Sequence, residues 1–98
     1  LFIEYDDPPM PEGGYLAIHK AVNYPEELKN DNIEGLALVQ VFIDKTGKIS
    51  NAKVIKTDHE AFGQAGLRAV ERASFKPAIK DGVPVGVYIV IPFHFRLD

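Results

Sequence analysis

The C-terminal segment VPVGVYIVIPFHFRLD (residues 83–98) constrains the fold more than any other part of the sequence. Its apolar residues recur at every second position, a period that predicts one long β-strand with one face in the core. Pro92 lies within this apolar run, and proline has no amide hydrogen, so within sheets it occurs on edge strands or at bulges. We therefore expect an exposed sheet edge, which usually invites aggregation.

The two faces of this predicted strand have different roles. The apolar face is expected to be core and comprises Val85, Val87, Ile89, Ile91, Phe93, Phe95 and Leu97. In an antiparallel sheet, backbone groups of one parity bond one neighbouring strand and those of the other parity point the opposite way. If Pro92 lies on the open side, the residues of its parity also present their backbone groups outward: Tyr88, Val90, His94 and Arg96.

Two further strands are predicted upstream. Residues 35–44 (GLALVQVFID) alternate cleanly, residues 44–48 (DKTGK) form a short hairpin turn, and residues 49–56 form the return strand. Alternation slips between residues 49 and 52, which indicates a β-bulge. The three segments together predict an antiparallel sheet.

One main helix is expected between the second and third strands. TDHE (57–60) has the spacing of a capping box, with Thr57 at the cap and Glu60 three residues later. The following residues carry an apolar stripe, interrupted by Gly63 and Gly66, which we expect to allow close approach to the sheet. Residues 74–84 are predicted to be a loop with a turn at Asp81–Gly82.

The N-terminal part is expected to lie on the domain as an accessory. Residues 1–14 are predicted to form an extended arm that turns at Gly13–Gly14, and residues 15–22 a short helix that packs through Leu16, Ile18 and Ala21. The predicted fold is therefore α+β: a three-stranded antiparallel sheet packed on one main helix, with an N-terminal arm and a short helix. A chain of 98 residues suits one domain.

Composition excludes several classes of function. The net charge is −3 and basic residues do not cluster, which argues against a nucleic-acid partner. There is no cysteine, and no apolar run reaches the length of a membrane span. His19, His59 and His94 lie on three different predicted elements, so we expect no metal site. No paired His or Gly-rich elbow accompanies a serine, so we predict neither an enzyme nor a cofactor.

Four stretches, in this order, resemble the C-terminal domain of the TonB family: YPEEL (24–28), IEGLALVQVFIDKTGKISNAKVIK (33–56), AVERASFKPAIKDGVPV (69–85) and IPFHFRL (91–97). The resemblance covers nearly the whole chain. Its most specific parts are the Tyr24–Pro25 pair, the spacing of Gly35, Asp44 and Gly47, and the FKPA motif at 75–78. We interpret residues 23–98 as the TonB-like domain and residues 1–22 as an arm and short helix packed on it.

The resemblance implies a role in transport across the outer membrane, for example of siderophores. Proteins of this family are anchored in the inner membrane by an N-terminal helix, energised by an ExbB/ExbD-type complex, and reach through the periplasm. Their C-terminal domain binds the TonB box of outer-membrane receptors as an added strand beside its own last strand, which is β-augmentation. Because the chain begins at Leu1 rather than methionine and its start lacks the charged and apolar regions of a signal peptide, we interpret it as a piece of such a longer protein.

The resemblance also implies candidate binding residues around the last strand. These are Tyr88, Val90, Pro92, His94, Arg96, Asn23, Tyr24 and Pro25. The best-studied members carry a Gln-Pro pair where this chain has Ala21-Val22, so a polar contact from that glutamine is lost here or is taken over by Asn23 or the arm. Tyr24–Pro25 has a second interpretation as a helix-start device, with Tyr24 packed against the core.

Two questions stay open at this stage: what covers the exposed edge, and to which kind of envelope protein the domain belongs. The exposed edge is covered either by a partner, by the arm LFIEY (1–5), or by a second copy of the domain in a homodimer. The domain belongs either to an energy transducer or to a membrane metalloprotease-type signalling protein. A TolA-like envelope scaffold is a third, weaker hypothesis.

Overall fold

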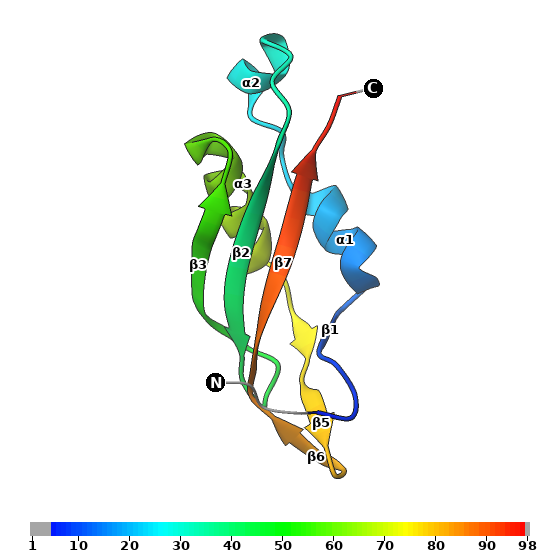
Figure 1. The fold of residues 1–98 in the computed structure, drawn as a ribbon. Helices are drawn as coiled ribbons and strands as arrows, with labels where there is room; N and C mark the ends of the chain where they lie inside the picture. The colour runs from blue at the N-terminus through cyan, green and yellow to red at the C-terminus, as the bar shows by residue number, and fades with distance from the viewer. Residues whose placement is uncertain (1–4, 98) are drawn as a thin grey trace.

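The sheet has three antiparallel strands, as predicted. The structure is a computed structural model that describes residues 5–97. Strand β2 (Gly35–Ile43) is central, β3 (Ile49–Thr57) lies on one side of it and β7 (Val87–Phe95) on the other. Helix α3 (Glu60–Glu71) covers one face of β2 and β3 (Figure 1). The predicted α+β architecture is confirmed.

The hydrophobic core lies between the sheet and α3. The inward residues of β2 and β7 are buried, except for Gly35 and Ile89, which are partly buried. The helix contributes Phe62, Ala65, Ala69 and Val70. A Cβ atom on Gly66 would lie 2.9 Å from Cδ2 of Phe93, and one on Gly63 would lie 3.0 Å from Cγ1 of Val54. Both glycines therefore let the helix approach the sheet, as the sequence predicted.

The hairpin turn between β2 and β3 is organised by Asp44. Its Oδ1 accepts hydrogen bonds from the backbone N–H of Thr46 (2.8 Å) and of Lys48 (3.0 Å), and from the Thr46 hydroxyl. These bonds, the hydroxyl one foremost, hold the pKa of the Asp44 carboxyl below its usual value. Gly47 follows with a φ of 87°, and a Cβ there would lie 2.0 Å from the carbonyl oxygen of Phe75.

The predicted bulge in β3 is present. The register between β2 and β3 shifts between Gln40 and Phe42, where Asn51 adopts a positive φ of 54°, and again between Leu38 and Val39. The predicted capping box is wrong, because Thr57 is still the last residue of β3 and the helix begins at Glu60. His59 is the N-cap residue, and its side chain accepts from the backbone N–H of Ala61.

The C-terminal segment is two strands rather than one. Strand β6 (Val83–Val85) forms a hairpin with β5 (Ala78–Lys80) around Asp81 and Gly82, both with positive φ. Gly86 separates β6 from β7, and a Cβ there would lie 2.5 Å from the Phe42 ring. The turn was predicted correctly, but the loop expected at 74–84 is largely extended and also contains β4 (Phe75–Lys76).

The N-terminal arm pairs with residues 75–79 rather than with β7. Strand β1 (Met10–Pro11) is antiparallel to β4, and the backbone of Asp7 bonds that of Ile79 in both directions. The described residues 5–11 thus run along the β4–β5 segment, while most of LFIEY (1–5) lies outside the described residues. The arm then turns at Gly13 and Gly14, both with positive φ, as predicted.

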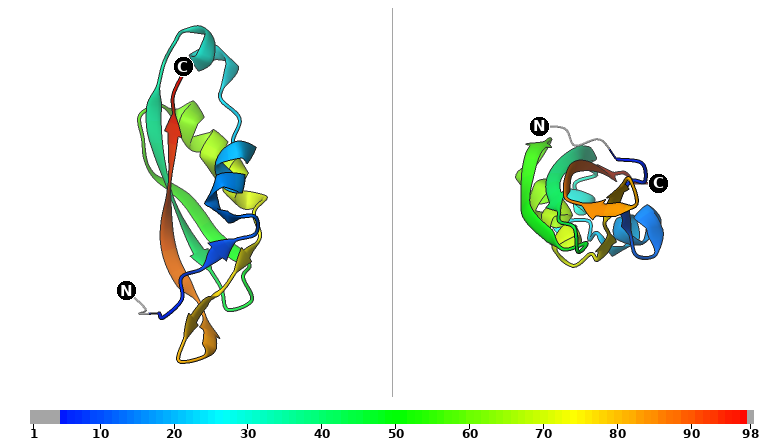
Figure 2. Two further views of the ribbon diagram at one scale, coloured as in Figure 1. Left: turned by 90° about the vertical axis from the view of Figure 1, so that its right-hand side faces the viewer. Right: turned by 90° about the horizontal axis from the view of Figure 1, so that it is seen from below.

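Helix α1 (Gly14–Ala21) follows this turn, and helix α2 (Glu26–Asn30) comes shortly after it. Helix α1 lies on the same side of the sheet as α3, beyond the outer edge of β7 (Figures 1 and 2). Ile18 is its buried residue, whereas Leu16 is 66% exposed and Ala21 is exposed, so two of the three expected packing residues are wrong. No helix within residues 5–97 combines the length and apolar character needed to cross a membrane.

Candidate partner-binding edge of the sheet

Strand β7 pairs with β2 in one unbroken register, from Gly35 opposite Phe95 to Ile43 opposite Val87. Pro92 lies opposite Leu38 in this register. The carbonyl oxygen of Pro92 lies 2.9 Å from Nε2 of His19 on α1, on the side away from β2. Since a residue in an antiparallel ladder directs both backbone groups to the same side, Pro92 belongs to the outward parity.

The same parity holds along β7 because its register with β2 has no shift. Tyr88, Val90 and His94 therefore direct their N–H and C=O groups away from β2. Within residues 5–97, β2 is the only strand that pairs with β7. The side chains of Tyr88 and Val90 are 51% and 45% exposed, and those of Pro92 and His94 are also exposed. The edge thus combines free ladder positions with exposed apolar side chains.

Arg96 does not belong to this row. Strand β7 ends at Phe95, so Arg96 lies one residue beyond the ladder, although its side chain is exposed. The next residue is tied back to the domain, because the N–H of Leu97 donates to Oε2 of Glu34 at 2.6 Å. The predicted site is therefore a strand edge of four residues, Tyr88, Val90, Pro92 and His94, with Arg96 beside its end.

The Asn23–Pro25 segment lies next to this end of β7. The ring of Tyr24 packs edge-on against Phe95, with a centroid distance of 5.5 Å, and against Phe62 at 5.6 Å. Its hydroxyl donates to the carbonyl of Ile33. Burial, and then the Glu34 carboxylate, raise the pKa of Tyr24 above its usual value. Tyr24 thus packs against the core as its second interpretation predicted, and of residues 23–25 only Asn23 is exposed.

Pro25 is the N-cap residue of α2 and is partly buried. Asn23 is exposed and lines a small cleft between α1 and α3, together with Ala21, Arg68 and Arg72. The structure thus brings residues 23–25 close to the end of β7 but does not place them along its edge.

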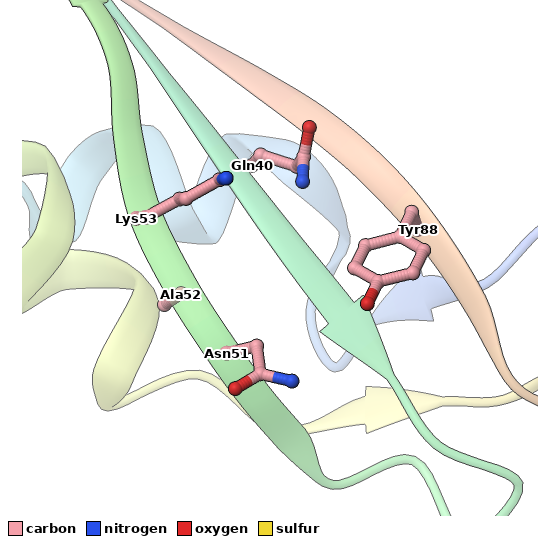
Figure 3. A pocket seen from close by; sticks show the side chains of 5 residues that line it. All are labelled: Gln40, Asn51, Ala52, Lys53 and Tyr88. Carbon is pink, nitrogen blue, oxygen red and sulfur yellow. The ribbon is translucent and has the colours of Figure 1, made fainter. Parts of the chain in front are cut away.

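The face of the sheet opposite α3 has a shallow cavity of about 290 Å³ that crosses all three strands (Figure 3). It is lined by Gln40, Asn51, Ala52, Lys53 and Tyr88. The Tyr88 ring leans over the central strand, with its centroid 4.9 Å from that of Phe42. This cavity adjoins the open half of the β7 edge, so side chains of a chain bound there have polar and aromatic groups within reach.

His19 was not predicted to have a role, yet it is the side chain that reaches the β7 edge. Its Nδ1 lies 2.7 Å from the Tyr15 carbonyl, and its ring packs on Phe93 at a centroid distance of 5.5 Å. A carbonyl oxygen only accepts, so the ring donates to both Tyr15 and Pro92 when it is doubly protonated. Helical periodicity could not reveal this contact, because it joins residues 73 positions apart.

The shifted pKa values among residues 5–97 have causes in local packing and hydrogen bonding. No group of three His, Cys, Asp or Glu side chains is placed to hold a metal ion within residues 5–97. The raised pKa of Tyr15 follows from burial, with a smaller contribution from Tyr5, beside an edge-on contact with Phe75. The pKa shifts of Tyr15, Tyr24 and Asp44 thus arise from burial and from hydrogen bonds of the hairpin turn.

Several known proteins are similar to this chain in sequence. The family model for the Gram-negative bacterial TonB protein C-terminal region matches residues 20–97. Protein TonB of Vibrio cholerae is 34% identical over 76 residues, which cover 76% of this chain and 31% of that protein. Protein tonB2 of Pseudomonas aeruginosa is 33% identical over 91 residues, covering 92% of this chain and 33% of that protein. The chain spans about a third of the length of these relatives.

Solved structures with the same fold include two TonB C-terminal domains. That of Helicobacter pylori (residues 179–285) superposes with a TM-score of 0.67 at 25% identity, covering 86% of this chain and 77% of that chain. That of Pseudomonas aeruginosa superposes with a TM-score of 0.68 at 21% identity, covering 95% of this chain and 90% of that chain, and shows the fold alone. The chain belongs to the family of C-terminal domains of Gram-negative bacterial TonB proteins.

Proposed function

We propose that this chain is the receptor-binding domain of a TonB-type energy transducer and captures an extended segment of an outer-membrane receptor as a strand beside β7. The observation that carries the proposal is the outer edge of β7. It is regular over its whole length, keeps the N–H and C=O groups of Tyr88, Val90 and His94 pointing outward, and has exposed apolar side chains beside them. An extended peptide adds to such an edge by completing its ladder.

The energetics favour a modest affinity in which side chains matter. Ordering a segment of about six residues costs on the order of 6–12 kcal/mol of backbone entropy. Ladder hydrogen bonds contribute only about 1 kcal/mol each. Contacts with Tyr88, Val90 and the cavity beside Tyr88 must therefore supply the surplus, and we expect a roughly micromolar dissociation constant.

A strand added along β7 also suits the transmission of force. Pulling the receptor segment along its own axis loads several ladder hydrogen bonds together. In this proposal the domain works in the periplasm, an N-terminal helix outside this chain anchors the full-length protein in the inner membrane, and an ExbB/ExbD-type complex energises it. The domain itself contributes binding and force transfer, not catalysis.

The test is an NMR titration of the ¹⁵N-labelled chain with a TonB-box peptide from a receptor of the same organism. We expect shifts concentrated in residues 87–95 and around Asn23–Pro25, saturating at micromolar peptide. N-methylation of every second peptide residue, in the parity that faces β7, should abolish binding, whereas N-methylation in the other parity should not. Equal loss with both peptides, or shifts confined to β3, would contradict strand addition at β7.

Dilution of the free chain provides a second check of the same edge. If a second copy of the domain occupies β7, sedimentation should show a dimer whose dissociation exposes the edge. Peptide binding should then weaken as the protein concentration rises. A monomer at all concentrations leaves the edge to the receptor segment.

A further inference from the structure

The edge of β7 is not equally open along its length. The outward groups of Tyr88 and Val90 face solvent, beside the cavity on the open face of the sheet. The next outward acceptor, the carbonyl of Pro92, is already bonded by His19. Helix α1 therefore divides the edge into a free half at residues 88–90 and an occupied position at residue 92.

His19 is held at this position by three contacts. Nε2 lies 2.9 Å from the Pro92 carbonyl oxygen, Nδ1 lies 2.7 Å from the carbonyl oxygen of Tyr15 one turn earlier on α1, and the ring packs on Phe93. The helix behind it is fixed to the domain by buried Ile18 and by the contact of Tyr15 with Phe75. The side chain is nevertheless exposed, so it can leave the edge without unfolding the helix.

We propose that His19 is an autoinhibitory latch on the β7 edge: it occupies the Pro92 carbonyl in the free domain and must swing away before a partner strand can extend past Val90. This inference rests on the proposed function, since it concerns the same edge. A partner segment docks first on the free half, at Tyr88 and Val90. An N–H of the partner then replaces the imidazole at Pro92, and the ladder continues to His94.

The latch makes a quantitative prediction for peptide affinity. A partner strand that displaces His19 forms a hydrogen bond to the Pro92 carbonyl but breaks the one from His19. The free energy of binding gained at Pro92 is therefore reduced by the strength of the His19 bond. A hydrogen bond of this kind corresponds to roughly a 2- to 10-fold change in an equilibrium constant. His19→Ala should therefore tighten binding of a TonB-box peptide by about that factor. Lys20→Ala, at an exposed position on the same helix, is the matched control and should leave affinity unchanged.

The experiment combines NMR titrations of the wild type, His19→Ala and Lys20→Ala with amide hydrogen exchange of each free chain. The latch predicts that the NMR signals of residues 14–21 and 87–95 of the wild type shift together during the titration. His19→Ala should bind the peptide more tightly. In the free chains, the α1 amides should exchange faster in His19→Ala than in Lys20→Ala. Peptide binding to His19→Ala alone would support the latch most directly.

The outcomes separate this inference from the proposed function. Binding at β7 with α1 unperturbed and equal affinity for His19→Ala overturns the latch and leaves strand addition standing. Weaker binding by His19→Ala also overturns it, because His19 would then assist the partner. If no chain binds the peptide, strand addition and the latch fail together, and faster α1 exchange in His19→Ala would then show only that the contact between His19 and Pro92 stabilises α1.

Discussion

The two edges of the sheet are built in opposite ways. Strand β3 pairs with β2 through two register shifts, and Lys53 and Lys56 lie opposite Gln40 and Leu38. Strand β7 pairs with β2 without a shift and places exposed Val90 opposite the same Gln40. Bulges and lysines are common means by which proteins prevent pairing at an edge. Bulges and lysines thus disfavour pairing at the β3 edge, whereas His19 occupies a single position of the β7 edge, the Pro92 carbonyl.

The comparison shows that regularity distinguishes the edge that can accept a partner strand. The β3 edge does not have to pair with another chain, so it tolerates register shifts. An edge that must accept a strand has to keep a regular ladder. Both edges flank the same central strand, so substitutions that exchange their properties are informative. The predictions below run from the largest expected effect to the smallest.

The largest effect is expected on the inner face of β7. Phe93 is fully buried and contacts Gly66 of α3 closely, so Phe93→Ala should destabilise the domain by about 3–5 kcal/mol. Val90→Ala, on the outward face of the same strand, should change the unfolding free energy by only about 0.5 kcal/mol. Urea unfolding of both variants measures the contrast. Similar losses would mean that β7 is not held by its inner face.

The turn that joins β3 to the central strand comes next. Gly47→Ala should destabilise by about 2–3 kcal/mol, because Gly47 has a positive φ and an added Cβ meets the carbonyl oxygen of Phe75. Gly82 has a similar φ but open space around it, so Gly82→Ala should cost only about 1 kcal/mol. Thermal unfolding of the pair separates the clash from the backbone conformation. Equal effects would exclude the clash as a cause.

Exchanging one residue between the edges tests the comparison directly. Lys53 of β3 and Val90 of β7 both lie opposite Gln40, so Val90→Lys gives β7 the residue that β3 has at this position. The variant should bind an uncharged TonB-box peptide about 3- to 10-fold more weakly, because it loses an apolar contact and gains a charge at the edge. Calorimetric titration measures the change. The reciprocal Lys53→Val should leave peptide affinity unchanged, since the bulges still block β3. Tighter binding by Lys53→Val would show that charge alone closes that edge.

The smallest effect concerns the Asp44 turn. Because hydrogen bonds lower the pKa of Asp44 in the folded state, its contribution to stability is present above the unfolded-state pKa, about 4, and is lost as the pH falls through the folded-state pKa. Asp44→Asn should therefore melt at a lower temperature than the wild type at pH 7, and the difference should shrink toward pH 3. A difference that does not change with pH would contradict a role for the carboxylate charge.

Much of the fold could be predicted from the sequence because its determinants are local. Alternation identified β2, β3 and β7, the slip after Ile49 located the bulge, and the Gly13–Gly14 pair marked the turn before α1. The failures arose where a contact between distant residues overrode a local pattern. Thr57 fits a helix cap by spacing, but β3 extends through it, since ladder pairing with Ala37 takes precedence over capping.

For the candidate site, the sequence by itself determined which residues share the outward parity of the last strand, because proline cannot donate to a ladder and parity repeats every two residues. Only the tertiary structure decided how much of that edge is free. In the folded domain β7 ends at Phe95, Tyr24 packs against Phe62, and His19 lies at hydrogen-bond distance from the Pro92 carbonyl. Such contacts join residues far apart in the chain and depend on how α1 packs beside the sheet, which no local pattern encodes.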